Sequence, residues 1–434
     1  MTAATIAALA SGRPPSAVAI IRISGPTAWA AVAALAASSL PPPRRLSLRQ
    51  LRDPESGAPL DSALVVVFPG PATATGEDLA ELHLHGGLAV IADVLDALTR
   101  QSGVRLAEPG EFTRRAFTNQ RLDLAQVEGL ADLIAAETSS QRSQALALAG
   151  GALGTLADIW RGRIIAVLAQ AEAGLDFAED EADVADRIAE ASSAMLCGLA
   201  AELDALLADA ARAARIRDGL AIAVVGAPNV GKSSLVNALA MRDAAIVTSV
   251  AGTTRDLVEV LVNLGGIAAT LIDTAGLRET DDCAEKEGIR RARLRAASAD
   301  LVLHIIEPTS TVGDEQPGAW LVCNKADTLG DEVTRGDYLV SALTGDGVSK
   351  LREGLEEWAQ AVTRPGEPAL LGHARHRAAF ADAADAVRAA AITNDDVLRA
   401  EDLRRAAHAL GRIAGRVDVD DVLDRIFSQF CIGK

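Results

Sequence analysis

The segment GAPNVGKSS, residues 226–234, has residue types and a spacing that suit a bound nucleoside triphosphate. It follows an apolar run and precedes a helix-forming segment, which is the context that the GxxxxGK[ST] phosphate-binding loop requires. Gly226 and Gly231 let the backbone curl so that its N–H groups face phosphate oxygens. Lys232 neutralises charge on the β- and γ-phosphates, and the Ser233 hydroxyl is a ligand for magnesium.

Two further segments supply a magnesium site and a base-binding carboxylate. DTAG, residues 273–276, ends an apolar run, so that Asp273 can hold magnesium through water and the Gly276 amide can sense the γ-phosphate. NKAD, residues 324–327, ends the next strand but one. The two carboxylate oxygens of Asp327 can accept hydrogen bonds from the N1–H and the exocyclic amine of guanine, and adenine lacks that donor pair. The pattern therefore favours guanine.

Two loops complete the predicted nucleotide site. SAL, residues 341–343, is expected beside the base, and GTTRD, residues 252–256, lies where a magnesium-binding threonine belongs. The four motifs in this order predict a GTPase whose magnesium ligands are Ser233 and Thr254. The residues expected to contact GTP are Asn229, Val230, Gly231, Lys232, Ser233, Ser234, Thr248, Ser249, Val250, Ala251, Gly252, Thr253, Thr254, Asp273, Thr274, Ala275, Gly276, Asn324, Lys325, Asp327, Ser341 and Ala342.

The residue after DTAG is informative because of what it lacks. GTPases of the Ras type place a glutamine there, which orients the attacking water. Here the residue is Leu277, whose side chain has no polar group. The group that orients the water must therefore come from another part of the chain.

The chain around these motifs begins with residues 1–118, in which short strand-like runs alternate with turns and a helical segment. Residues 17–25 and 63–70 are rich in β-branched and apolar side chains and predict strands. Residues 79–87 alternate apolar and polar side chains before a glycine turn and predict a third strand. Residues 87–103 carry apolar side chains at helical spacing. We expect an α+β domain.

The remaining chain predicts a helical domain that is interrupted by an α/β domain. Residues 119–215 are helical in pattern, and the acidic run at 175–184 suits a solvated loop or helix end. Residues 216–362 alternate strands and helices, as in an open and mainly parallel sheet. Residues 363–434 are helical again. One face of the last predicted helix holds Val419, Val422, Leu423, Ile426, Phe427 and Phe430.

These segments together predict a multidomain α/β fold. Its parts are an α+β N-terminal domain, a discontinuous all-α helical domain and an inserted Ras-like P-loop G domain with a mainly parallel sheet.

Composition and charge limit the partners. The chain has 434 residues, a net charge of -17 and only 3% aromatic residues. A protein this acidic does not bind nucleic acid through its bulk charge, so any such contact needs a local basic patch or a partner protein. The four cysteines form no CxxC pair, and no secretory segment or long apolar run is present. We expect a cytoplasmic protein in a reducing compartment, away from membranes.

The inserted position of the G domain, GTTRD, Leu277 and the closing FCIGK together resemble one family, the tRNA modification GTPase MnmE (TrmE). The segments RISG (22–25), FPGPATATGEDLAELHLHGG (68–87), EPGEFTRRAFTNQRLDLAQVEGLADLI (108–134) and LDFAEDE (175–181) are also similar to that family. The similarity runs the whole length of the chain.

The resemblance implies a homodimer with a tetrahydrofolate derivative, 5-formyl- or methylene-tetrahydrofolate, bound in the N-terminal domain. It implies a heterotetramer with the flavoprotein MnmG, which brings FAD. The complex would use GTP hydrolysis to add an aminomethyl-type group to C5 of the wobble uridine of certain tRNAs.

Individual residues take roles from the same resemblance. Folate contacts would be Arg22, Glu81, Arg121 and Lys434, although a polar residue in a strand such as Arg22 also suits plain solvent exposure. Potassium ligands would be Asn229, Thr248, Val250 and Thr253. Catalytic candidates are Glu285, which would orient water, Cys431, which would act as a nucleophile or merely pack, and Arg255, which would act as a finger or pair locally with Asp256.

Three positions depart from the family pattern. Pro14 and Pro15 stand in a turn that is usually rich in glycine, Arg121 replaces a frequent lysine, and Glu307 replaces a more usual aspartate. None of them lies in the GTP motifs.

Two other classes of protein share parts of this pattern. A ribosome-assembly GTPase of the Era or EngA type has similar G motifs but usually carries a basic RNA-binding module, and none is visible here. A folate protein with an inert G domain conflicts with the intact GKS, DTAG and NKAD segments. A folate-binding assay separates the first alternative from the favoured interpretation.

Overall fold

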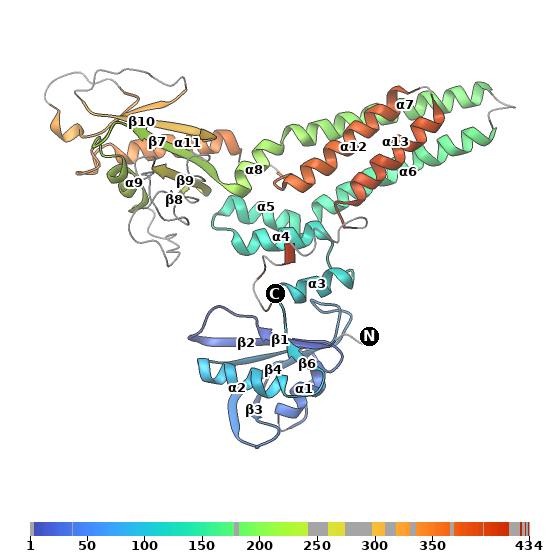
Figure 1. Ribbon diagram of the computed structural model, residues 1–434, viewed down its shortest axis with the longest axis vertical. Helices are drawn as coiled ribbons and strands as arrows, with labels where there is room; N and C mark the ends of the chain where they lie inside the picture. Colours follow the sequence, from blue (N-terminus) through green and yellow to red (C-terminus); the bar gives the residue numbers. More distant parts are fainter. Residues whose placement is uncertain are drawn as a thin grey trace, which may run out of the picture. The chain divides into compact units, whose positions relative to one another are not determined.

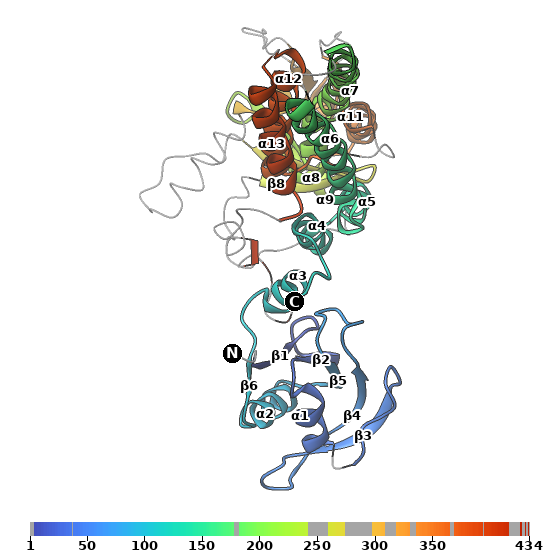
Figure 2. The ribbon, with the colours of Figure 1, turned by 90° about the vertical axis from the view of Figure 1, so that its right-hand side faces the viewer.

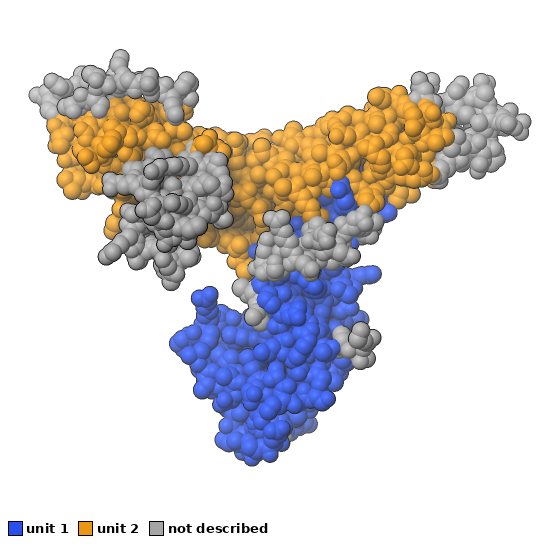
Figure 3. All heavy atoms as spheres, in the orientation of Figure 1, with its two compact units in different colours: residues 1–131, 149–161, 410–434 blue, residues 132–148, 162–409 orange. Residues whose placement is uncertain are grey.

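The structure is a computed structural model that describes residues 4–36, 38–177, 182–241, 259–273, 297–308, 318–329, 336–364, 369–393, 395–415, 426–427, 430 and 433. The chain divides into two compact units (Figure 3). Unit 1 holds residues 1–131, 149–161 and 410–434, and unit 2 holds residues 132–148 and 162–409. The sequence-based division at 1–118, 119–215, 216–362 and 363–434 stays a prediction.

A six-stranded sheet organises unit 1, in the order β3-β4-β5-β2-β1-β6. Neighbouring strands are antiparallel except for β1 and β6, which are parallel. The strands are β1 (Thr5–Leu9), β2 (Ser16–Ser24), β3 (Ser47–Arg52), β4 (Pro59–Phe68), β5 (Leu79–Gly86) and β6 (Val104–Leu106). The predicted strands at 17–25, 63–70 and 79–87 are confirmed, whereas β1, β3 and β6 were not predicted.

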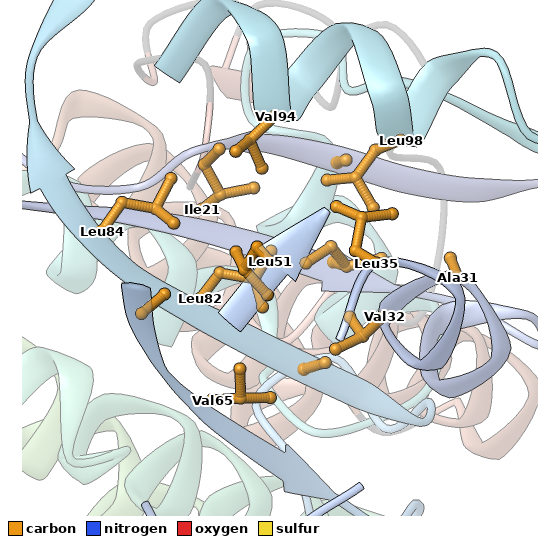
Figure 4. Packing of buried hydrophobic residues seen from close by; sticks show 14 of the residues in the cluster. Ile21, Ala31, Val32, Leu35, Leu51, Val65, Leu82, Leu84, Val94 and Leu98 are labelled. Atoms are coloured by element: carbon orange, nitrogen blue, oxygen red, sulfur yellow. The ribbon is translucent and has the colours of Figure 1, made fainter. Parts of the chain in front are cut away.

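One face of this sheet packs against helices α1 (Ala28–Leu35) and α2 (Leu88–Thr99). Alternation along the strands sends Ile21, Leu82 and Val65 into this core, where they meet Val94 and Leu35 (Figure 4). Residues between them on the same strands face the opposite side of the sheet. Phe112 packs on Ile6 and Ala8 over one part of that side. The remaining part, which we call the open face, carries Arg22 and Glu81 with 27% and 16% of their side chains exposed.

Segments from both ends of the sequence meet inside unit 1. After β6 come α3 (Glu111–Thr118) and α4 (Leu124–Ala135). Phe427 and Phe430 are buried against Val127 and Phe117, with the Phe117 and Phe427 ring centroids 6.4 Å apart. Gly433 lies so close to β1 that a Cβ on it would approach the Leu9 carbonyl oxygen to 2.0 Å. Phe427 and Phe430, which the sequence places on one face of the last helix, are therefore both buried, while Val419, Val422 and Leu423 of that face lie outside the described residues.

Unit 2 contains the helical bundle and the G domain. Its helices are α5 (Ser139–Ala149), most of α6 (Ala152–Phe177), α7 (Ala182–Ala208), α8 (Ala210–Asp218), α12 (Ala374–Ile392) and α13 (Asp396–Gly411). Helices α6, α7, α12 and α13 run side by side in both ribbon views (Figures 1 and 2). The chain leaves this bundle after α8 and returns to it at α12, so the G domain is an insertion, as predicted. The acidic run also falls at a helix boundary, because α6 ends at Phe177 and α7 begins at Ala182.

The inserted domain is a six-stranded sheet in the order β12-β11-β10-β7-β9-β8. Only β8 is antiparallel to its neighbour. The elements are β7 (Leu220–Gly226), α9 (Lys232–Met241), β8 (Glu259–Leu264), β9 (Ile267–Asp273), β10 (Leu301–Ile306), β11 (Trp320–Cys323), a 3-10 turn (Ala326–Thr328), β12 (Tyr338–Leu339) and α11 (Val348–Thr363). The mainly parallel sheet is confirmed, and β8 is the strand here that was not predicted.

One stretch, Ala191–Asp218, is long and apolar enough to cross a membrane by length and composition alone. It comprises the end of α7 and all of α8, and α7 packs along α12 in the bundle. Core helices of globular proteins pass the same test, so the stretch is weak support for a membrane span.

Candidate functional site

The phosphate-binding loop joins β7 to α9 through backbone that most residues avoid. Gly226, Asn229 and Gly231 have φ values of 149°, 65° and 92°. A Cβ at Gly226 would lie 2.3 Å from the Ile305 carbonyl oxygen of the neighbouring strand, so this position requires glycine. Asn229 is exposed and is a residue type that tolerates the left-handed conformation.

Lys232 and Ser233 both make side-chain hydrogen bonds within the site, while their phosphate and magnesium contacts stay predictions. Lys232 is 6% exposed, and its Nζ donates hydrogen bonds to the carbonyl oxygens of Gly226 at 2.9 Å and Ala227 at 2.8 Å. The Ser233 hydroxyl donates to the Asp273 carboxylate. Strand β9 ends at Asp273, which pairs with Val224 near the end of the parallel strand β7. The Asp273 carboxylate and the Ser233 hydroxyl therefore lie together at the carboxyl ends of these strands. A hydroxyl and a carboxylate oxygen placed together fit a magnesium ion.

Asn324 connects the phosphate loop to the base-binding loops. Its side chain is buried, with Nδ2 donating to the Val230 carbonyl oxygen at 2.9 Å and Oδ1 accepting from the Ala342 amide at 3.0 Å. The Ser341 hydroxyl, fully buried, donates to Asp327 Oδ1 at 2.6 Å. The structure therefore brings the three motifs GKSS, NKAD and SAL together.

Glu307, a departure noted in the sequence, has a partner in this site. Its Oε1 lies 2.5 Å from Lys325 Nζ. Lys325 itself has a left-handed backbone with a φ of 62°. The longer side chain at position 307 thus holds the lysine of NKAD from the neighbouring strand β10.

Several residues predicted to contact GTP, to act in catalysis or, for Lys434, to contact folate lie outside the described part of the chain, and their assignments stay predictions. They are Thr248, Ser249, Val250, Ala251, Gly252, Thr253, Thr254, Arg255, Thr274, Ala275, Gly276, Glu285, Cys431 and Lys434.

On the open face of the unit 1 sheet, Arg22 and Glu81 are cross-strand partners. Arg22 donates from Nε at 3.0 Å and from NH2 at 2.9 Å to Glu81 Oε1, and His83 Nε2 lies 3.4 Å from Glu81 Oε2. The Arg22 guanidinium also lies 6.0 Å from the centre of the Phe112 ring. Arg22 is therefore held by an acidic and an aromatic neighbour rather than merely facing solvent.

Arg121 is placed by the end of α3. Its amide donates to the Ala116 carbonyl oxygen at 2.8 Å and the Gln120 amide donates to the Phe117 carbonyl oxygen at 2.9 Å, which is a Schellman ending. Gln120 takes the left-handed position, with a φ of 55°. A Cβ at Gly76 would lie 3.3 Å from Arg121 Cγ, so the 70–78 loop approaches this arginine closely.

A buried polar network beside these residues was missed in the sequence. Ser24, on the Arg22 side of β2, donates to Glu77 Oε2 at 2.7 Å, and Glu77 in turn accepts from Arg115 NH1 at 3.0 Å. Arg115 also donates to Glu111, whose other partner is Arg105. Burial alone would raise the pKa of Glu111, but Arg105, the Glu108 amide and Arg115 lower it to about 2. The spacing of Glu111 and Arg115, four residues apart on a helix, was the available signal.

A second missed cluster lies in unit 2, where three helices meet. Asp132 accepts a hydrogen bond from Arg217 Nε at 3.1 Å and lies 2.7 Å from His373 Nε2. Gln144 Nε2 donates to the carbonyl oxygens of Ala213 at 2.9 Å and Ala369 at 2.7 Å. A cavity of about 130 Å³ is lined by Asp132, Ala135, Ala136, Gln141, Gln144, Arg217 and Asp218. The Asp132–Arg217 pair and the Gln144 side chain join helices, whereas Asp218 pairs with Arg217 of its own helix.

Comparison with known proteins decides the family. Residues 5–121 match the family description "GTP-binding protein TrmE N-terminus" and residues 124–431 match "MnmE helical domain". The tRNA modification GTPase MnmE of Azorhizobium caulinodans is 50% identical over 432 residues, 99% of each chain. The chain belongs to the MnmE family. The protein of that name in Methylorubrum populi is 51% identical over 440 residues, covering 99% of this chain and 98% of that one.

Membership of the MnmE family identifies the G domain as that of a GTP hydrolase that acts in tRNA modification, with GTP and magnesium as its ligands. The G domain of the T. maritima FeoB iron transporter is also similar, at 27% identity, covering 32% of this chain and 99% of that one with a TM-score of 0.23.

Proposed function

We propose that this member of the MnmE family is a potassium-dependent GTPase that, with the flavoprotein MnmG, adds a carboxymethylaminomethyl or aminomethyl group to C5 of the wobble uridine of tRNA. A tetrahydrofolate derivative is the one-carbon donor. The protein works in the cytoplasm as a homodimer and forms a heterotetramer with MnmG, which supplies FAD.

The observation that carries the folate half is the Arg22–Glu81 pair on the open sheet face. Glu81 is a carboxylate with its two oxygens directed by Arg22 and His83, and its side chain is 16% exposed. Such a carboxylate suits the donor pair on the amino-pyrimidine edge of a pterin, while Arg22 and Arg121 suit its carbonyl oxygen or glutamate tail. Glu81→Gln keeps the shape and removes the charge-assisted acceptor.

Calorimetry with 5-formyl-tetrahydrofolate tests this site. We expect binding by the unsubstituted protein and a loss of roughly tenfold or more in Glu81→Gln, since hydrogen bonds to charged groups contribute ~1.5–3 kcal/mol. His85→Gln is a matched control, because His85 lies on the same strand and pairs with Asp61 instead. If the unsubstituted protein at high micromolar concentration gives no heat, this site is wrong.

The potassium requirement rests on Asn229 in the phosphate loop. Its side-chain oxygen would ligate the cation, with Thr248, Val250 and Thr253 completing the shell, and a cation there offsets charge that develops in the transition state. We expect GTP turnover to depend on potassium and to fail in sodium. Equal turnover in the two buffers excludes the idea.

Glu285 would orient the attacking water in place of the missing glutamine, and Arg255 is the weaker candidate. Glu285→Ala should keep GTP binding and lose most hydrolysis. Cys431 is assigned separately: Cys431→Ser should lose modification with folate affinity retained if the thiol reacts, and should modify tRNA normally if it only packs.

The whole proposal is tested by mass spectrometry of wobble uridines in a deletion strain. We expect the modified uridine to disappear and to return when the gene is restored. Removal of residues 431–434, which include Lys434, should fail to restore it while leaving potassium-dependent GTP hydrolysis intact. A deletion strain with normal wobble uridines would overturn the assignment.

A further inference from the structure

The first 52 residues of this acidic sequence are basic because they contain no acidic side chain. Residues 1–52 contain six arginines and no lysine, aspartate or glutamate, so they contribute +6 to the net charge of -17. Residues 53–434 together contribute -23. Four of the six, which we call the arginine edge, are Arg44, Arg45, Arg49 and Arg52. The protein thus has the local basic patch that an acidic chain needs if it is to touch a polyanion.

The arginine edge lies on and beside β3, the outermost strand of the unit 1 sheet. Arg44, Arg45 and Arg52 are exposed and Arg49 is half-buried. Strand β3 has six residues and extends about 16 Å at ~3.3 Å per residue. The guanidinium groups are therefore spread along an edge rather than gathered in a pocket.

These arginines meet neutral partners. Arg49 Nε donates to the Ser39 carbonyl oxygen at 3.1 Å, and Arg52 NH1 donates to the Gly57 carbonyl oxygen at 3.0 Å. Arg44 NH2 donates to the Ala72 carbonyl oxygen at 2.5 Å. Among the residues that the structure describes, none of the four forms an ion pair with a carboxylate.

The carboxylates nearest in sequence are engaged elsewhere. Asp53 and Glu55 both pair with Arg100, and the Ser56 amide and Arg100 hold the pKa of Asp53 far below its usual range. Asp61 lies 2.7 Å from His85 Nδ1. The charge of the arginine edge is thus left for an external anion.

We propose that the arginine edge binds the phosphate backbone of tRNA. Guanidinium groups bind phosphate in bidentate fashion. When they neutralise phosphates, the RNA releases its bound counterions, and this favours binding against the repulsion from the protein's overall charge of -17. Charged residues also protect edge strands from pairing, and Leu46 and Leu48 are 54% and 61% exposed, so a protein contact is the competing outcome. The inference rests on the proposed function, because that function makes tRNA the RNA in question.

The test is fluorescence anisotropy of the full chain with an unmodified tRNA transcript that has uridine at the wobble position, across a KCl series. The triple variant Arg45→Gln/Arg49→Gln/Arg52→Gln should have a slope of log K against log [KCl] that is shallower by about 2–3. At about 0.1 M salt its affinity should fall roughly 100-fold, since each lost phosphate contact contributes ~0.7–0.9 to the slope. GTP turnover should be unchanged.

A matched control removes three arginines that carboxylates already neutralise. Arg388 pairs with Asp204 and Asp385, Arg404 with Glu401, and Arg405 with Asp402. Arg388→Gln/Arg404→Gln/Arg405→Gln changes the net charge equally and should keep the unsubstituted slope. An equal loss in both variants would overturn the proposal, as would an unchanged slope in the first.

Two outcomes separate this inference from its premise. If the unsubstituted chain binds no tRNA even at low salt, the proposed RNA contact and the arginine edge fail together. If it binds tRNA and the triple variant binds with the same slope, only the arginine edge fails. A change in mass by light scattering with an unchanged slope would assign the edge to contact between copies of this chain instead.

Discussion

At the scale of single residues, the Asp327 carboxylate, which we expect to bind the base, is held by one buried hydroxyl. Ser341 fixes Asp327 Oδ1, and Asn324 fixes the Ser341–Ala342 backbone through the Ala342 amide. The carboxylate therefore presents two acceptors in a set orientation. If Asp327 binds the base as predicted, the choice of nucleotide depends on the chemistry of this single group.

Asp327→Asn should exchange the preferred base. An amide offers one donor and one acceptor, which opposes the two donors of guanine but matches xanthine, whose C2 carries an oxygen. We expect GTP affinity to fall by about 100-fold or more, because one N–H donor of guanine would face the amide NH2 group in place of an acceptor. Xanthosine triphosphate should bind more tightly than GTP. Competition titration with a fluorescent nucleotide measures both, and retained GTP preference would show that Asp327 does not read the base.

Glu111 makes the stability of unit 1 depend on acid pH. Its pKa is about 2 in the folded chain against an ordinary value of 4.5. A lowered folded pKa gives stability that is fully present above about 4.5 and is lost as the pH falls toward 2, at most about 3 kcal/mol. We expect Glu111→Gln to lower the Tm at pH 7 and to have a progressively smaller effect as the pH falls through that window. A pH-independent difference would contradict this account of Glu111.

At the scale of elements, the turn between β8 and β9 ties the G domain to α5 within unit 2. The Ser140 amide donates to the Gly266 carbonyl oxygen at 3.1 Å. The same hairpin ends at Asp273, which accepts the Ser233 hydrogen bond. One hairpin therefore joins the predicted magnesium site to the helical part of the unit.

Gly266→Ala should loosen this contact. The new Cβ would lie 2.4 Å from Ser139 Oγ, on a backbone with a φ of 92°. We expect a loss of about 1–3 kcal/mol, seen as a lower Tm for unit 2. Gly318→Ala is the control, because Gly318 has a φ of 87° with nothing within 4 Å of its Cβ position. Equal losses would mean that backbone strain alone accounts for the effect.

Gln120→Gly, in contrast, should raise the stability of unit 1. A left-handed residue other than glycine costs ~1–2 kcal/mol, while glycine costs ~0.5–1 kcal/mol more entropy on folding. The balance predicts a gain of about 0.5–1 kcal/mol in the stability of unit 1. Thr118→Gly, inside α3, should instead destabilise. A lower Tm for Gln120→Gly would show that the glutamine side chain contributes contacts of its own.

A strand could be predicted from the sequence where an apolar run is bounded by turn residues. Strands β2, β4, β5, β7 and β9 are apolar runs bounded by turn residues, and each was predicted. Strand β1, TIAAL, is rich in alanine, and β3, SLRQLR, carries two arginines, so neither has the composition of a strand. These strands form because the sheet supplies partners from distant parts of the chain.

In the candidate sites too, residues within short motifs could be predicted, whereas the pairing of residues across strands could not. The P-loop, NKAD and SAL residues were selected because each belongs to a short motif, and the structure brings these loops together, while their contacts with GTP stay predictions. The Arg22–Glu81 pair could not be predicted, because the register of β2 on β5 spans 59 positions of sequence and a one-residue slip would separate the two side chains.

At the scale of the whole molecule, unit 1 is closed by residues far apart in sequence. Phe427 is fully buried, with Arg114 5.1 Å from its ring centre and Gly110 against its backbone. Phe427→Ala should cost about 3–5 kcal/mol of unit 1 stability. It should leave the Tm of unit 2 and its GTP affinity in place. Calorimetric unfolding resolves the two, and an unchanged unit 1 transition would contradict this packing.

Because of this packing, unit 1 cannot be completed until the last residues of the chain have been translated. Unit 1 begins with residues 1–131 but needs the aromatic pair at 427 and 430 to cover Phe117 and Val127. The ribosome makes about 300 residues between those segments, which takes roughly 15–60 s at ~5–20 residues per second. During that interval the nascent chain exposes the apolar side chains that Phe427 and Phe430 later cover, so the newly made first segment is open to chaperones and proteases.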